Sequence, residues 1–90
     1  IKTANITPEI RNTLNVNPAV KGVIIIDVNP DSQAAEEGIM PNDIILEINR
    51  KPIFSTDDFK SCLSKAKPGH SVIFLLQRDD HTFYKAFKIR

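Results

Sequence analysis

The chain has 90 residues, of which 41% are hydrophobic and 26% are charged, a balance typical of one small globular domain with a single core. Its twelve basic and eleven acidic residues leave a formal net charge of +1 with no long basic stripe, so no nucleic-acid partner is expected. The longest apolar runs, residues 23–26 and 72–76, fall far short of the roughly 18 to 20 residues that a membrane span requires, so no span is expected.

The first segment, residues 1–6, is predicted to be extended, and the signals of a helix start follow it. Thr7 suits the N-cap, Pro8 suits the first helical position, and Glu9 is favoured near the positive end of the helix dipole. The residue before a proline disfavours helical backbone, so this helix should end before Pro18. We expect a helix of about two turns.

Residues 22–28 are apolar on both alternating faces and rich in β-branched side chains, which predicts a central strand covered on both sides. Ser32 should then cap a brief helix that ends at Gly38, because glycine adopts the left-handed conformation easily. Another strand is predicted at residues 43–48. Three of its apolar side chains are expected to share one face: Ile44, Leu46 and Ile48.

The longest helix is predicted over residues 56–67, with Ser55 or Thr56 as its N-cap and Pro68 closing it. Apolar side chains recur along it at helical spacing and therefore share one face: Phe59, Cys62, Leu63 and Ala66. By this periodicity alone, the shared face is a core face.

Two apolar-rich stretches, residues 71–78 and 82–89, complete the chain and are separated by a hairpin connection at residues 79–81. Several strands and one substantial helix predict an α+β fold that is mainly β. We expect a small, partly open β-barrel or sandwich, capped by one long and two short helices.

Several segments resemble the run that marks bacterial PDZ domains: Gly22-Val23-Ile24-Ile25, residues 28–39, Pro41-Asn42-Asp43-Ile44-Ile45 and Ile48-Asn49. Two more are similar to the HtrA/Do family of serine proteases in particular: Ile6-Thr7-Pro8-Glu9-Ile10 and Ala66-Lys67-Pro68-Gly69. The resemblance covers nearly the whole chain. It implies one PDZ domain over residues 1–90.

The sequence departs from the family pattern at three positions. Asn42 and Arg50 stand where the family has glycines, and Gln33 stands where it has a proline. Asparagine tolerates a positive φ, but arginine does so at a cost, so the turn at Arg50 is expected to adopt another geometry.

PDZ domains add an extended peptide, usually a C-terminal end, as a strand at a sheet edge. The resemblance implies that this peptide lies between residues 1–6 and the helix at 56–67. The implied peptide-binding residues are Ile1, Lys2, Thr3, Ala4, Phe59, Cys62 and Leu63. In the family a loop holds the peptide's carboxylate, and here Ile1 would be its last residue. We therefore expect a fragment that lacks the preceding loop and binds a free C-terminus poorly.

No catalytic residue, metal site or cofactor is predicted. The sequence has no Gly-x-Ser-x-Gly elbow or plausible Ser/His/Asp set. Cys62 and His70 lack a third orienting residue, so Cys62 is interpreted as a small buried hydrophobe. Residues 79–81 lack further metal ligands and are expected to be a solvated hairpin tip.

The resemblance implies that the parent protein is a serine endopeptidase whose catalysis belongs to another domain. The implied partners are peptides or unfolded-protein C-termini and that protease domain, in a periplasmic or extracytoplasmic location. A second hypothesis is structural: the same edge strand would dock against a neighbouring subunit or domain. A further alternative is a PDZ domain of another bacterial protease or of a secretion protein.

Overall fold

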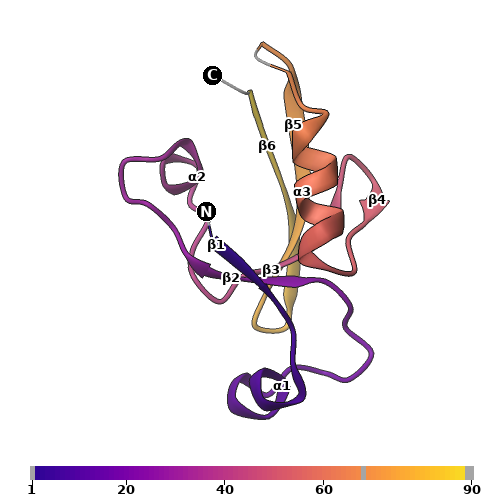
Figure 1. The fold of residues 1–90 in the computed structure, drawn as a ribbon. Coiled ribbons are helices and arrows are strands. Elements are labelled where there is room, and N and C mark those ends of the chain that lie inside the picture. Colours follow the sequence, from indigo (N-terminus) through magenta and orange to yellow (C-terminus); the bar gives the residue numbers. More distant parts are fainter. Residues whose placement is uncertain (1, 68, 89–90) are drawn as a thin grey trace.

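The computed structural model describes residues 2–67 and 69–88 of the chain. Within these residues, six strands form one antiparallel sheet in the order β1-β2-β3-β5-β6, and β4 pairs with β3 (Figure 1). The strands are β1 (Lys2–Asn5), β2 (Val23–Asp27), β3 (Ile44–Ile48), β4 (Lys51–Pro52), β5 (Ser71–Arg78) and β6 (His81–Lys88). The helices are α1 (Pro8–Leu14), α2 (Gln33–Glu36) and α3 (Thr56–Ser64). The predicted α+β, mainly β fold is confirmed, and the sheet stays open between β1 and β6.

One core lies between the sheet and α3. Its buried side chains are Val23, Ile25, Ile39, Ile45, Ile48, Ile53, Phe59, Val72, Phe74 and Leu76. The rings of Phe59 on α3 and Phe74 on β5 meet edge to face, with centroids 6.4 Å apart. Such a contact adds to the free energy gained by burying the two rings. It fixes α3 over the sheet.

The helix starts are where local chemistry predicts them. The Thr7 hydroxyl accepts the N–H of Ile10 and caps α1, and Ser32 caps α2 in the same way. Of the two N-cap candidates for α3, Ser55 is the cap, because its hydroxyl accepts the N–H of Asp58. Each cap satisfies an amide that the helix itself leaves without a partner.

Two predictions about the central strands do not hold in full. β2 lies inside the sheet between β1 and β3, and residues 23–25 are buried on both alternating faces as predicted, but Ile26 is 48% exposed and the middle strand of the sheet is β3. In β3 the pairing register shifts between Ile45 and Glu47. An extra residue at a register shift breaks the two-residue alternation. Ile45 and Ile48 therefore belong to the core cluster, whereas Ile44 is buried outside it and Leu46 is half-buried, so the predicted shared face of Ile44, Leu46 and Ile48 is wrong.

Helix α3 is shorter than predicted and ends at Ser64 instead of Lys67. The N–H of Lys65 bonds the carbonyl of Cys62, and the N–H of Ala66 bonds that of Leu63. These three-residue spacings tighten the last turn and end the α-helix. The predicted stop, Pro68, lies outside the described residues.

Both hairpin turns have two residues. Asp79 and Asp80 connect β5 to β6, so His81 belongs to β6 and not to the connection, while the predicted strand end at Ile89 lies outside the described residues. Between β3 and β4, Asn49 and Arg50 both have positive φ, 51° and 67°. The expectation that this turn would avoid a left-handed Arg50 is wrong.

The side chain of Asn49 explains the left-handed backbone at Arg50. Its Oδ1 accepts the N–H of Ile73 at 2.9 Å, and its own N–H donates to the carbonyl of Ile73 at 2.8 Å. Two hydrogen bonds thus fix the turn against β5. A two-residue turn with positive φ at both positions matches the twist of the flanking strands, so Arg50 takes the strained conformation that this geometry requires.

Candidate functional site

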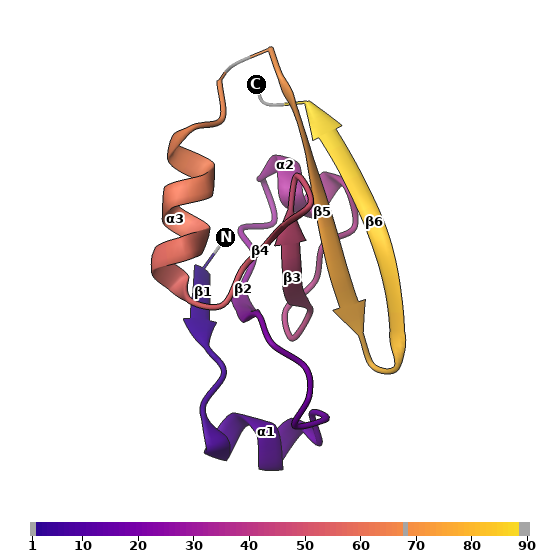
Figure 2. The same ribbon diagram turned by 90° about the vertical axis from the view of Figure 1, so that its right-hand side faces the viewer.

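The candidate site is the outer edge of β1. Among the described residues, β1 pairs with β2 alone, with Thr3 opposite Ile25 and Ala4 opposite Ile24. Helix α3 lies beside β1 in both views (Figures 1 and 2). The N–H of Thr56, at the start of α3, donates to Oδ1 of Asn5 at 2.9 Å. This bond ties the end of β1 to the helix, so an open strand edge runs alongside α3.

The sequence-predicted residues of β1 lie on this strand, but they differ in exposure. Lys2 is exposed, whereas Thr3 and Ala4 are half-buried. Ile1 lies outside the described residues. A strand edge offers backbone N–H and C=O groups to an added strand whatever its side chains are. The backbone N–H and C=O groups of β1 are thus the main groups with which this edge can bind a ligand.

The predicted residues of α3 face the sheet. Phe59 is 5% exposed and belongs to the core, so it has little surface left for a ligand. Cys62 and Leu63 are half-buried and pack against the core cluster. These two side chains keep exposed apolar surface, and they are better placed than Phe59 to contact an added peptide.

Three surface cavities lie outside the stretch where β1 runs beside α3, and one of them adjoins the end of β1. One, of about 560 Å³, is lined by Asn5, Ile6, Arg11, Lys21, Gly22 and Phe54. One of about 300 Å³ lies between the end of α3 and the start of β5. None of the three cavities is lined by Phe59, Cys62 or Leu63.

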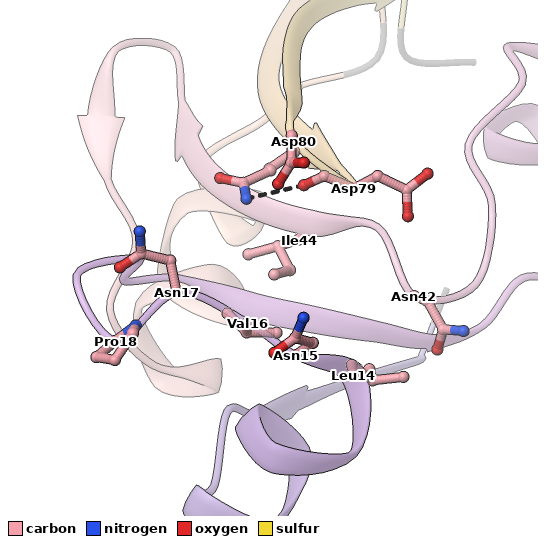
Figure 3. A pocket seen from close by; sticks show the side chains of 10 residues that line it. Leu14, Asn15, Val16, Asn17, Pro18, Asn42, Ile44, Asp79 and Asp80 are labelled. Carbon is pink, nitrogen blue, oxygen red and sulfur yellow. Dashed lines mark hydrogen bonds between the residues drawn. The ribbon is translucent and has the colours of Figure 1, made fainter.

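The third cavity, of about 450 Å³, lies between the segment after α1 and the β5–β6 turn (Figure 3). Amide side chains and the carboxylates of Asp79 and Asp80 dominate its lining, and Nε2 of Gln77 donates to the carbonyl of Asp79 at 3.0 Å. In the part of the chain that the structure describes, no group of three or more His, Cys, Asp or Glu side chains is arranged to hold a metal ion.

The sequence reasoning missed an ion pair that joins two parts of the fold. Asp43 is 1% exposed, and its carboxylate accepts bonds from Nε and Nη2 of Arg78 at 2.8 and 2.7 Å and from the N–H of Met40 at 3.0 Å. Arg78 also donates to the carbonyl of Gly38 at 2.8 Å, and its guanidinium lies 5.0 Å from the ring centroid of Phe83. The hydrogen bonding of its guanidinium to the carboxylate of Asp43 is the main cause that raises the pKa of Arg78 above its ordinary value.

This arrangement is structural. The bidentate pair holds the loop before β3 against the β5–β6 hairpin, and a guanidinium fork suits that geometry. The role of Asp43 in binding loop amides could be inferred from its place before a strand. Its partner could not, because 35 residues separate the two and no local pattern connects them.

The open sheet, with a free strand edge beside a helix, is the arrangement of a known class of domain. The family model of the PDZ domain matches residues 5–84, and the chain therefore belongs to the PDZ family. Curated proteins that it resembles include serine endoproteases. One is the probable periplasmic serine endoprotease DegP-like of Chlamydia pneumoniae, 35% identical over 79 residues that cover 88% of this chain and 16% of the relative. Another is serine endoprotease DegS of Escherichia coli, 31% identical over 61 residues that cover 68% of this chain and 17% of the relative.

The chain thus spans about one sixth of the length of the curated relatives that it matches. The resemblance to PDZ domains of HtrA-type proteases is confirmed. The names of the DegP-like relatives place those proteins in the periplasm. No helix in the described ranges 2–67 and 69–88 combines the length and apolar character needed to cross a membrane.

Solved structures have the same fold. The HtrA-type protease AlgW with a decapeptide gives a TM-score of 0.87 at 20% identity, covering 98% of this chain and 27% of that one. The HtrA3 PDZ domain bound to the phage-derived ligand FGRWV gives a TM-score of 0.81 at 20% identity, and the match covers 98% of this chain and 79% of that one. The serine endoprotease from Yersinia pestis gives a TM-score of 0.70 at 31% identity, and the match covers 76% of this chain and 25% of that one.

Proposed function

We propose that this PDZ domain binds an extended peptide, usually the C-terminal end of an unfolded or regulatory protein, by adding it as a strand to β1. The observation that carries the proposal is the edge of β1, which has no strand partner among the described residues and runs beside α3. The HtrA3 PDZ domain was solved with a peptide ending in valine, and this supports the same class of ligand. The binding residues proposed here are Ile1, Lys2, Thr3, Ala4, Cys62 and Leu63, with Phe59 as part of the core cluster against which Cys62 and Leu63 pack.

In this proposal the peptide runs antiparallel to β1. Its carboxyl end lies near Lys2, and its upstream residues point toward Asn5. Backbone hydrogen bonds supply affinity that does not depend on sequence, whereas Cys62 and Leu63 contact the last side chain. Burying one apolar side chain contributes about 1.5 to 3 kcal/mol. After the costs of ordering the peptide, the free energy of binding is about −8 kcal/mol or weaker, which corresponds to micromolar affinity or less.

The wider role follows from the relatives. We propose that the domain recruits substrates to an HtrA/Do-like serine protease, or relays their binding to it, in the periplasm or another extracytoplasmic compartment. The catalytic residues of that protease lie in another domain. The relatives are named endoproteases and are much longer than this chain, which supports the proposal.

A phage-displayed library of C-terminal peptides tests the binding proposal. We expect enrichment of peptides with an apolar last residue. Selection without any such enrichment would contradict it and favour the structural hypothesis, in which β1 docks on a neighbouring domain.

A pair of variants locates the binding. Leu63→Ala should weaken a selected peptide about tenfold, because it removes apolar surface beside β1. The matched control is Ile73→Ala, which truncates a 37% exposed side chain on β5 and should leave affinity unchanged. Equal losses in the two variants would place the ligand elsewhere.

A further inference from the structure

The cavity of about 560 Å³ lies where β1 ends. Asn5 is the last residue of β1, and Ile6 continues the chain out of the sheet. The other walls come from α1, from the segment entering β2 and from the segment entering α3: Arg11, Lys21, Gly22 and Phe54. Because Asn5 also binds the N–H of Thr56, the cavity joins the end of the β1 edge to the start of α3.

A peptide paired with β1 would pass this cavity. An extended chain rises about 3.3 Å per residue, so each residue of a strand antiparallel to β1 lies opposite one residue of β1. With its last residue near Lys2, its residue opposite Asn5 is about the fourth from the end. The fifth and sixth residues from the end then leave the sheet beside Ile6, which lines the cavity, and side chains that extend over Ile6 would reach the cations on its far wall.

The cavity carries two cations and no carboxylate among its lining residues. Lys21 is exposed, and within residues 2–67 and 69–88 its ammonium group has no hydrogen-bond or ion-pair partner. Arg11 is half-buried, and one donor, Nη1, is bonded to the carbonyl of Asn17 at 3.1 Å. The rest of its guanidinium makes no ion pair in the described part of the chain.

Phe54 adds an apolar wall. It is 61% exposed, which is unusual for a phenylalanine in a domain with one small core. The N–H of Phe54 donates to Oδ2 of Asp58 at 3.0 Å, so the backbone that carries the ring is fixed before any ligand arrives. An aromatic ring on a fixed backbone, in a cavity that two cations also line, offers contact area at little cost in backbone entropy.

We propose that this cavity is an upstream subsite that selects peptides with acidic side chains at about the fifth and sixth positions from their C-terminus. Lys21 and Arg11 pair with the carboxylates, and Phe54 and Ile6 contact the stems of the same side chains. This inference rests on the proposed function, because the peptide reaches the cavity only by pairing with β1. It makes Lys21 and Arg11 specificity-determining residues.

Three probe peptides test the subsite. The first is a decapeptide ending in valine with glutamate at the fifth and sixth positions from its end. The second has glutamine there, and the third consists of the last four residues alone. Titrations followed by ¹H–¹⁵N correlation spectra give the affinity and the shifted amides together. We expect the acidic decapeptide to bind about three- to tenfold more tightly than its amide counterpart, with the ratio approaching one as salt rises from about 0.05 M to about 0.5 M.

Charge reversal assigns the preference to the cavity. Lys21→Glu should abolish or invert the ratio without changing the affinity of the tetrapeptide, and Arg11→Gln should lower the ratio. The matched control is Lys51→Glu, which makes the same charge change at an exposed residue of β4 away from the cavity. A ratio that Lys51→Glu reduces as much as Lys21→Glu would overturn the subsite in favour of a general charge effect.

The same spectra separate failure of the subsite from failure of the proposed function. If every peptide shifts the amides of β1 and the two decapeptides bind alike, the subsite is refuted and the edge is not. If no peptide shifts the amides of β1, the edge proposal fails. Shifts around Lys21 and Gly22 without shifts in β1 would also overturn the inference, because the cavity would then bind independently of the edge.

Discussion

At the scale of single residues, backbone conformation decides how the strands of this domain are connected. Asn42, Asn49, Arg50 and Asp79 all have positive φ, and three of the four are residue types that tolerate it. Arg50 is the exception. Its left-handed φ is imposed by a turn that Asn49 fixes against β5 through two hydrogen bonds.

Replacing Arg50 by glycine should therefore stabilise the protein. The left-handed conformation costs a residue with a Cβ about 1 to 2 kcal/mol, and the greater freedom of glycine in the unfolded chain returns about half of that. We expect Arg50→Gly to raise the free energy of unfolding by about 0.5 to 1 kcal/mol in urea titrations. Lys51→Gly, one residue further on in β4, should lower it instead. A gain in both variants would show that strain at Arg50 is not the cause.

Residue-level features with local causes could be predicted from the sequence. Thr7 and Ser32 cap helices because their hydroxyls bond amides three residues ahead, and this signal lies in neighbouring letters. The partner of Asp43 could not be predicted in this way. Arg78 meets it only when the loop before β3 and the end of β5 are brought together by the fold.

At the scale of elements, the strands were easier to locate than their order and faces. The stretch Ser71–Arg78 is predicted with its observed bounds, because an apolar-rich run that ends at a turn is a local pattern. The register shift in β3 depends on how β3 pairs with β5, which no property of residues 43–48 alone specifies. The early end of α3 depends on competing turn bonds at Lys65 and Ala66. Long-range pairing thus limits what periodicity can predict.

The ion pair between Asp43 and Arg78, which joins the loop before β3 to the β5–β6 hairpin, should contribute measurably to stability. Arg78→Met leaves the buried carboxylate of Asp43 without its bidentate partner, at a cost of about 2 to 3 kcal/mol in urea unfolding. Arg78→Lys keeps the charge but loses the fork and should cost less. An unchanged unfolding midpoint in Arg78→Met would contradict this.

The pH dependence of this contribution has a definite sign on the arginine side. The pKa of Arg78 is raised in the folded state, chiefly by the hydrogen bond that it donates to Asp43. A raised pKa stabilises the fold at every pH below the ordinary titration range of arginine, and the effect is lost only as pH rises through the folded-state pKa. Between neutral and mildly alkaline pH, the difference between Arg78→Met and the parent protein should therefore stay constant.

At the scale of the whole molecule, the two edges of the sheet are not equivalent. β6 is long, carries Lys85 and Lys88, and receives a hydrogen bond from Gln33 of α2 at the carbonyl of Lys88. Charged side chains and a covering element are means by which proteins protect an edge from pairing. β1 is short and lies beside the apolar face of α3. Composition and periodicity did not distinguish these edges. The family resemblance did distinguish them, because it implies which strand of the sheet accepts the peptide.

Because the domain has one small core, a ligand at β1 should stabilise all of it. A peptide that binds only the folded state at ten times its dissociation constant adds about 1.4 kcal/mol to the free energy of unfolding. For a domain of this size, that corresponds to a rise of about 6 to 11 °C in Tm. Thermal unfolding followed by circular dichroism, with a peptide ending in valine, measures it, and the same peptide ending in aspartate is the control. Equal shifts with the two peptides would mean that the last side chain is not recognised, and the apolar face of α3 would then have to be interpreted as core alone.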